Sequence, residues 1–290
     1  MHKLLFTPNT PFDMTDWECR QITEVFAGVN CVMALDENGQ TLQKIKNPDL
    51  MARTKFWKNI THIALSKCIE GAAIGLVKDG TCMISKRPVR KICADLCLDF
   101  DHINSVVKSW TEVVQVEASD AYFALRSDGT VQYVSLSQRD QSEYAAVKGW
   151  RDVVRIVAGT QNSIFGITKN GTILSAGFNS MNINKRLSAY SNAVDICPVG
   201  SECTNAYVLR GDGSVEELWG THCNSAINVK TRRLGWHFNY KAVALTDDHC
   251  LVDISVPNAP YVFSVDNKIV SFAVGDNNYC EPFVIGVAEL

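Results

Sequence analysis

The chain has 290 residues, of which 46% are hydrophobic and 20% are charged, and its formal net charge is −3. This composition is that of a globular protein with a full hydrophobic core, and the length allows one large domain or two ordinary ones. The balance of 28 basic against 31 acidic residues argues against non-specific nucleic-acid binding, so we expect no nucleic-acid partner.

The N-terminal segment contains one short apolar run, Leu4–Phe6, whereas a secretory signal peptide needs about 7–15 apolar residues. No stretch approaches the ~18 apolar residues of a membrane-spanning helix. The 11 cysteines are odd in number and scattered, and Cys31 and Cys250 occupy places where a small buried residue is expected. We therefore expect free thiols, a cytoplasmic location and no membrane contact.

Five similar turns recur along the chain: DENGQTL, VKDGTCM, RSDGTVQ, TKNGTIL and RGDGSVE. Asn-Gly and Asp-Gly pairs favour tight β-hairpins, because glycine adopts positive φ without strain and Asn and Asp tolerate it. The intervals between the glycines are 41, 49, 42 and 42 residues, a near-constant period that indicates a repeat architecture. The glycines are Gly39, Gly80, Gly129, Gly171 and Gly213.

The rest of each unit follows the same period. Before every turn lies a short alternating segment, such as YFALRS or AYVLRG, which is typical of a strand with one buried face. A more apolar stretch precedes it, and an aromatic residue leads that stretch. The unit is therefore an aromatic residue, a strand, a short turn, a second strand, the hairpin and a third strand. The aromatic residues are Trp17, Trp57, Trp110, Trp150 and Tyr190.

The third and fourth units share the Trp, the Val-Val pair and the Gly-Thr turn: SWTEVVQVEASDAYFALRSDGTVQYVS and GWRDVVRIVAGTQNSIFGITKNGTILSAGFN. This pattern resembles the repeat of the regulator of chromosome condensation family, whose members are seven-bladed β-propellers and include a β-lactamase inhibitor protein. The resemblance is clear over residues 17–216, although the Gly-His pair common in that family is mostly absent. The Trp-Asp propeller repeat has the same period, but its Trp-Asp and Gly-His signatures do not recur.

Two further units complete a set of seven. Tyr240–Asp266 has an aromatic start and paired strands, with Pro257 and Pro260 in place of a tight hairpin. The last unit lacks an outer strand, which residues 1–8 can supply. We therefore predict an all-β fold, a single-domain seven-bladed β-propeller closed by the N-terminal strand pairing into the C-terminal blade. The predicted repeats are 17–56, 57–109, 110–149, 150–189, 190–239, 240–267, and 268–290 with 1–8.

Function is expected where the repeat is interrupted, because the repeated residues hold the blades together. The first insertion, SKRPVRKICADLCLDFDHINSVVKSW, carries Arg87 and Arg90, which are candidates for binding an acidic partner. The alternative is a solvated loop. Its Cys93, Cys97 and His102 provide too few ligands for a zinc site, and we expect no metal.

The second insertion, residues 217–240, is rich in the residue types that carry most interface energy. The alternative for Trp236 is that it is a displaced blade aromatic in the core. The candidate partner-binding residues are Trp219, Arg232, Arg233, Trp236 and Phe238.

Catalytic motifs are missing from the sequence: there is no Gly-x-Ser-x-Gly, Walker or His-Glu-x-x-His pattern. The inner strands, such as VVRIVAG, are too apolar to suggest a polar site around the channel. We expect a non-catalytic, monomeric protein-binding propeller without cofactors. The alternatives are guanine-nucleotide exchange on a small GTPase, an activity that the resemblance implies, and an enzyme with a channel-centred site. The degenerate repeats and the cysteine content suggest a bacterial source.

Overall fold

In a computed structural model of the protein, the segments on either side of each glycine turn pair as antiparallel hairpins, as predicted. The structure describes residues 2–290 except 19, 48–52, 86–99, 137–140, 160–162, 178–186, 188, 200–204, 220–221, 228–229, 237–241, 256–259 and 278–280. Among the residues it describes, none of the helices has the length and apolar character needed to span a membrane.

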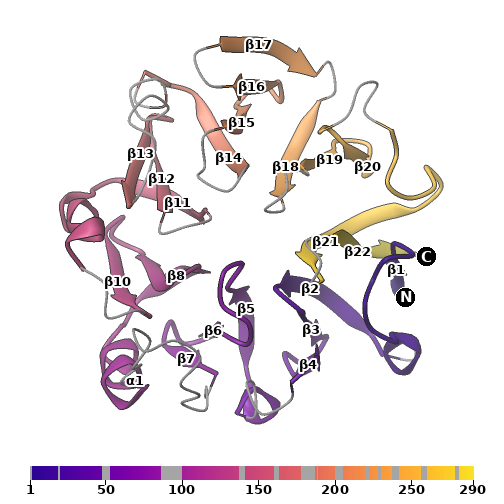
Figure 1. Ribbon diagram of the computed structural model, residues 1–290, viewed down its shortest axis with the longest axis horizontal. Coiled ribbons are helices and arrows are strands. Elements are labelled where there is room, and N and C mark those ends of the chain that lie inside the picture. Colours follow the sequence, from indigo (N-terminus) through magenta and orange to yellow (C-terminus); the bar gives the residue numbers. More distant parts are fainter. Residues whose placement is uncertain are drawn as a thin grey trace.

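The described strands form seven antiparallel sheets, numbered here as blades 1–7, which are arranged radially around a common axis (Figure 1). Blades 1 to 3 are β2 (Ile22–Gly28), β3 (Cys31–Asp36), β4 (Thr41–Ile45); β5 (Ile60–Leu65), β6 (Ala73–Val77), β7 (Cys82–Ile84); and β8 (Val113–Ala118), β9 (Ala121–Arg126), β10 (Val131–Ser135). Blades 4 and 5 are β11 (Val153–Ala158), β12 (Ser163–Thr168), β13 (Ile173–Gly177); and β14 (Ala193–Val199), β15 (Asn205–Arg210), β16 (Val215–Trp219), β17 (His222–Ile227). Blades 6 and 7 are β18 (Thr231–Trp236), β19 (Ala242–Thr246), β20 (Leu251–Asp253); and β21 (Lys268–Asp276), β22 (Pro282–Glu289), β1 (His2–Phe6).

The two ends of the chain meet in blade 7. Strand β1 is its outer strand and pairs antiparallel with β22, from His2 opposite Glu289 to Phe6 opposite Ile285. The predicted pairing of the N-terminal strand with the last blade is therefore confirmed. Blade 7 also contacts blade 1, because the Asn30 N–H donates to the Asp276 carbonyl oxygen at 3.0 Å.

The hairpin glycines link each blade to the next. The carbonyl oxygen of Gly171, for example, accepts a hydrogen bond from the N–H of Ala193, the first residue of β14, at 3.1 Å. Equivalent bonds run from Ile60 to Gly39, Val113 to Gly80, Val153 to Gly129 and Thr231 to Gly213. The repeated glycine therefore has two roles. It adopts the positive φ that the tight turn needs, and its carbonyl oxygen accepts a hydrogen bond from the next blade.

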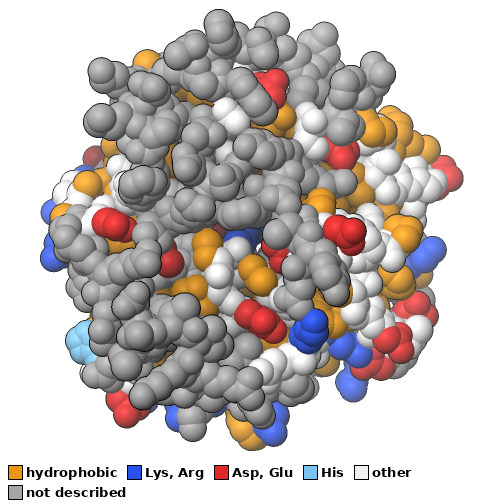
Figure 2. Space-filling model, viewed as in Figure 1, with side chains coloured by type: hydrophobic (Ala, Val, Ile, Leu, Met, Phe, Trp, Pro, Cys, Tyr) orange, Lys and Arg blue, Asp and Glu red, His pale blue; other side chains and the backbone are white. Residues whose placement is uncertain are grey.

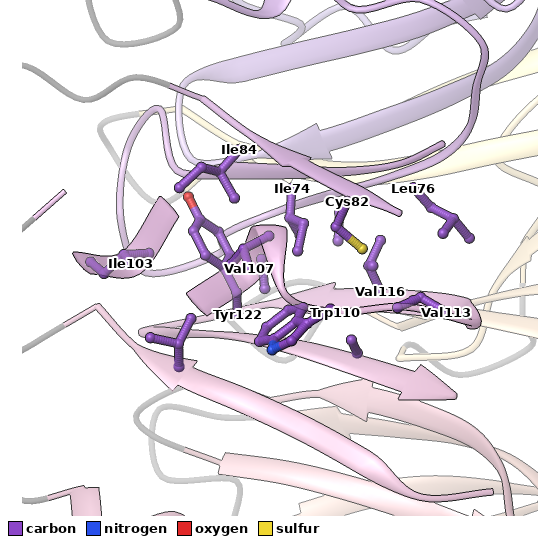
Figure 3. Close-up of a cluster of buried hydrophobic side chains, with 14 of the residues drawn as sticks. Ile74, Leu76, Cys82, Ile84, Ile103, Val107, Trp110, Val113, Val116 and Tyr122 are labelled. Carbon is purple, nitrogen blue, oxygen red and sulfur yellow. The ribbon is translucent and has the colours of Figure 1, made fainter. Parts of the chain in front are cut away.

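The hydrophobic core lies between adjacent blades rather than at the centre of the ring. Figure 3 shows one such cluster, in which side chains of blade 2 face those of blade 3 beside α1 (Phe100–Lys108). Its residues include Ile74, Leu76, Cys82, Ile103, Val107, Trp110, Val113 and Val116. The predicted aromatic ladder is largely buried: Trp17, Trp57, Trp110 and Trp150 are at most 6% exposed. Short 3-10 turns, Thr15–Trp17, Thr54–Phe56 and Gln141–Gly149, precede blades 1, 2 and 4.

Blade 6 begins earlier than the repeat boundaries predicted. Residues 217–240 are not simply an insertion, since β17 is a fourth strand of blade 5 and β18 is the inner strand of blade 6. The tight hairpin of blade 6 lies at Thr246–Cys250 rather than at the prolines. His249 stands at the place of the repeat glycine with φ 64°, and its carbonyl oxygen accepts from the Ile269 N–H at 2.9 Å.

Candidate functional site

Every inner strand has a β-bulge near its start. In β11 the pairing with β12 jumps from Val153 to Arg155, and the same shift occurs in β2, β5, β8, β14, β18 and β21. A bulge adds one residue to its strand and turns the neighbouring side chains. Val153 and Ile156 are consequently both buried between blades, Val154 is exposed, and Arg155 is one of the residues that line the channel.

The bulges create two rings of equivalent residues. The skipped residue of each bulge is named here the rim position. In blades 2 to 7 it directly follows a residue whose N–H donates to the hairpin of the preceding blade, so the rim lies on the face of the glycine hairpins. The residue after it is the channel position. Rim positions are Thr23, Thr61, Val114, Val154, Val194, Arg232 and Val270. Channel positions are Glu24, His62, Gln115, Arg155, Asp195, Arg233 and Ser271.

Four of the channel positions, His62, Arg155, Asp195 and Arg233, line a cavity of about 140 Å³ on the axis of the propeller, to which Lys67 and Glu117 also contribute. In the middle of the face seen in Figure 2, blue, red and orange side chains lie close together between parts drawn in grey. The channel wall is thus charged as well as apolar. The expectation that the inner strands are too apolar for a polar ring was wrong.

Three channel positions join adjacent blades by accepting hydrogen bonds from backbone N–H groups. Gln115 Oε1 accepts from Ile156 at 2.9 Å, and Asp195 Oδ2 accepts from Leu234 at 3.2 Å. Ser271 Oγ likewise accepts from the Val25 N–H at 3.4 Å, which connects blade 7 to blade 1. A backbone donor in the core needs an acceptor, so these side chains are structural.

Two further contacts join ionisable side chains of adjacent blades. The Arg155 guanidinium donates to both carboxylate oxygens of Asp195, at 2.7 and 3.0 Å, and Asp195 raises the pKa of Arg155. The Asp195 side chain is only 5% exposed, so this ion pair neutralises a buried carboxylate. On the other side of the channel, His62 Nδ1 lies 3.6 Å from Glu24 Oε1.

Glu117 and Lys67 lie deeper in the channel, beyond the bulges. Glu117 accepts hydrogen bonds from Gln115 Nε2 at 3.2 Å and from the Ala158 N–H at 3.5 Å, and burial raises its pKa. Lys67 Nζ donates to the Val274 carbonyl oxygen at 3.0 Å, and burial lowers its pKa. Both shifts favour the neutral forms of these groups.

Arg233 is half-buried and lies over the ring of Phe272, with its guanidinium carbon 5.2 Å from the ring centroid. Burial and the nearby charge of Arg155 lower its pKa. Phe272 fills the space above Gly235, where any side chain would collide with its ring. Among the described residues, no carboxylate forms an ion pair with Arg233.

The structure brings together two of the residues that the sequence suggested as partner-binding. Arg232 is an exposed rim residue whose Nη1 lies 3.4 Å from His249 Nε2, and Arg233 lines the channel beneath it. Trp219 and Trp236 lie in β16 and β18, and their side chains lie outside the described part of the structure, as do Arg87, Arg90 and Phe238 entirely. The partner-binding role of all seven residues stays a prediction.

The sequence analysis missed the channel positions because it examined the apolar character of each inner strand separately and did not align the seven inner strands with one another. Alignment of the seven bulges gives ITE, ITH, VVQ, VVR, AVD, TRR and IVS, in which the third residue is always polar. That column is the signal from which the ring could have been found. Within the described residues, no three His, Cys, Asp or Glu side chains are grouped to hold a metal ion.

Comparison with known proteins finds similarity in structure alone. No family model and no curated protein sequence matches the chain. The structure of Kap60 bound to yeast RCC1 (Prp20) matches with a TM-score of 0.62 at 13% identity, covering 96% of this chain and 82% of that chain. Prp20p from Saccharomyces cerevisiae matches with a TM-score of 0.62 at 11% identity, covering 95% of this chain and 83% of that chain.

Human WBSCR16 matches with a TM-score of 0.59 at 12% identity, covering 93% of this chain and 87% of that chain. The fold is an RCC1-like β-propeller. At these identities the likeness concerns the RCC1-like fold, so the chemistry of the site has to be argued from the residues of this chain.

Proposed function

We propose that this protein is a non-catalytic binding propeller that holds a protein partner at the rim of its channel, on the face of the glycine hairpins. The observation that carries the proposal is a run of exposed valines at equivalent positions of three adjacent blades. Val114 and Val154 are each 53% exposed, and Val194 is 47% exposed. Several large apolar side chains exposed at equivalent positions of neighbouring blades are typical of a protein interaction site.

The rim also has the polar components that an interface needs. Arg232 continues the ring in blade 6, next to Val194 in blade 5, and arginine is among the residues that most often dominate binding energy. Charged hairpin residues flank the valines, including the ion pair between Lys169 and Asp152 at 3.0 Å. An apolar centre with a charged border is the usual anatomy of a protein–protein interface.

Two of the similar structures support this reading by analogy. One is of Kap60 bound to yeast RCC1, and the other concerns binding of Prp20p to Gsp1p and histones. Propellers of this shape therefore serve as platforms for proteins. Nucleotide exchange on a small GTPase is the alternative function, and no residue of the rim specifically favours it.

The proposal is tested by partner capture with charged rim variants. Val154→Asp places a carboxylate at the centre of the valines, whereas Val265→Asp makes the same change at a valine that is also 53% exposed but lies in the turn before β21. We expect wild type and Val265→Asp to retain a specific partner from a lysate of the source cells, and Val154→Asp to lose it while circular dichroism shows an unchanged fold.

Retention of the partner by folded Val154→Asp would place the interface elsewhere on the propeller. If the captured protein is a small GTPase, acceleration of GDP release by the wild type, measured with a fluorescent nucleotide, would favour the exchange alternative over simple binding.

A further inference from the structure

Six of the seven channel positions have a polar partner within the described residues. Gln115, Asp195 and Ser271 accept backbone N–H groups, Arg155 pairs with Asp195, and Glu24 lies beside His62. Arg233 is the exception. Among the described residues its guanidinium has no hydrogen-bond acceptor and no ion-pair partner, and it lies over the ring of Phe272. A half-buried guanidinium without an acceptor is rare, since desolvating a charge is costly unless it is paired.

The surroundings of Arg233 orient the guanidinium for an incoming acceptor. The guanidinium carbon lies over the Phe272 ring, a contact that leaves the N–H groups without an oxygen acceptor among the described residues. Phe272 is itself fixed by packing over Gly235, and it is only 3% exposed. The donors of a guanidinium lie in one plane and match the two oxygens of a carboxylate, so a fixed planar fork favours that ligand.

The carboxylates near Arg233 do not form an ion pair with it among the described residues. Arg155 lies close enough to Arg233 to disfavour its charged form, and Arg155 is already bound to Asp195. Burial raises the pKa of Glu117, which weakens it as a counter-ion for Arg233. Glu24 and Asp195 also favour the charged form of Arg233, but Glu24 lies beside His62, Asp195 is paired with Arg155, and neither forms an ion pair with Arg233.

The cavity itself, about 140 Å³, has room for several water molecules or one small organic molecule. Its wall combines Arg233 with apolar side chains, among them Val25, Val157 and Ile196. We propose that the channel binds a small organic anion, with its carboxylate held by the Arg233 guanidinium and its apolar part against the inner strands. The carboxylate belongs to a free molecule or to an acidic side chain of a protein partner.

The direct test uses trifluoroacetate as the probe, observed by ¹⁹F NMR in the presence of the purified full chain at constant ionic strength. We expect the wild type to broaden the trifluoroacetate signal, and excess acetate to reverse the broadening. Arg233→Gln should weaken binding at least about tenfold, because hydrogen bonds to a charged group are lost. Arg233→Lys should bind with intermediate affinity, since it keeps the charge but loses the planar fork.

The matched control is Arg151→Gln, at an exposed arginine outside the channel whose guanidinium donates to the carbonyl oxygens of Lys148 and Trp150. This variant should bind trifluoroacetate as the wild type does. The proposal is overturned if the wild type gives no acetate-reversible broadening, or if Arg233→Gln binds as well as Arg151→Gln. If Arg233→Gln does not fold, Arg233→Lys takes its place, and a folded Arg233→Lys that binds trifluoroacetate as tightly as the wild type overturns the proposal.

A second arm separates the two sources of the carboxylate. If a partner's acidic side chain occupies the site, Arg233→Gln and excess acetate should both reduce capture of that partner. If the natural ligand is a free molecule, capture should be unaffected while trifluoroacetate binding is lost. The anion site and the partner-binding rim can fail separately, because trifluoroacetate binding is measured on the isolated protein.

Discussion

Replacement of Gly171 by valine tests the role of the repeated glycine in joining the blades. Gly171 has φ 76° in the hairpin between β12 and β13, and its carbonyl oxygen accepts from the Ala193 N–H of the next blade. A Cβ atom at this position would lie 2.6 Å from the Cα atom of Asn192 and 2.7 Å from the Ala193 nitrogen. Both obstacles are backbone atoms, so they cannot be relieved by a change of side-chain rotamer.

The expected cost is the sum of two effects. Placing an L residue in the left-handed region costs roughly 1–2 kcal/mol, and more for a β-branched side chain. Displacement of the adjacent strand then weakens a hydrogen bond between blades, which contributes about 1 kcal/mol. We expect Gly171→Val to lower the free energy of unfolding by about 3 kcal/mol.

Urea denaturation followed by tryptophan fluorescence and circular dichroism measures this loss. Gly149→Val is the control, because Gly149 has no atom within 4 Å of the added Cβ and no positive φ, and we expect it to change stability by less than about 1 kcal/mol. Gly213→Ala should be milder than Gly171→Ala, since its nearest neighbour lies 3.6 Å away. Equal urea midpoints for Gly171→Val and the wild type would refute the role assigned to the glycine.

Three other perturbations have defined outcomes. Trp150→Ala should lower the free energy of unfolding by about 3–5 kcal/mol, measured by urea denaturation, because the buried indole packs over Gly166 and leaves a cavity when removed. Arg155→Ala should cost about 2–3 kcal/mol by leaving Asp195 without its counter-ion, and adding Asp195→Asn, which removes the charge but keeps an oxygen acceptor for the Leu234 N–H, should recover part of that loss; a double variant no more stable than the single one would contradict the pairing. Burial raises the pKa of Glu117, so the folded state binds its proton more tightly than the unfolded state and loses stability as the pH rises above about 4.5. Glu117→Gln should consequently be more stable than the wild type at pH 7 but not at pH 4, and a constant difference across that range would rule out this cause.

The ring of blades was predictable because its signals are local and repeated. A glycine that needs positive φ and a tryptophan that fills the space between blades leave the same mark in each unit. Gly171 and Trp150 are examples, with φ 76° and 6% exposure respectively. The N-terminal strand was predictable for a related reason: the last unit is one strand short, and β1 supplies it beside β22.

The inner strand and the hairpin of blade 6 could not be predicted, because other residue types stand there in place of the repeated glycine and the valine. His249 adopts the left-handed conformation that glycine has in the other hairpins, with φ 64°, so the Asp-Gly mark is absent. The inner strand β18 contains Arg232 and Arg233 where neighbouring blades have a valine followed by one polar residue, and its sequence was therefore interpreted as part of an insertion. A strand that faces a polar channel does not need apolar alternation.

The channel ring was hidden by the bulges. A regular strand places alternate residues on one face, but the bulge buries residues three apart, such as Val153 and Ile156, and releases the two between them. Since period-2 analysis assumes uninterrupted pairing, it assigns Arg155 to the wrong environment. Only comparison between repeats shows that the same position is polar in every blade.

The bulges separate residues that the fold needs for packing from residues whose side chains can differ between blades. The residues that flank each bulge pack between blades and must be apolar or small, whereas the rim and channel positions carry no such requirement. At the channel position the seven blades supply Glu, His, Gln, Arg, Asp, Arg and Ser on the same backbone. Some of these side chains hold neighbouring blades together, as Asp195 does, and Arg233 has no such task among the described residues. The position that the fold leaves unconstrained, on the axis where all seven blades converge, is where a ligand can be recognised without cost to the repeat.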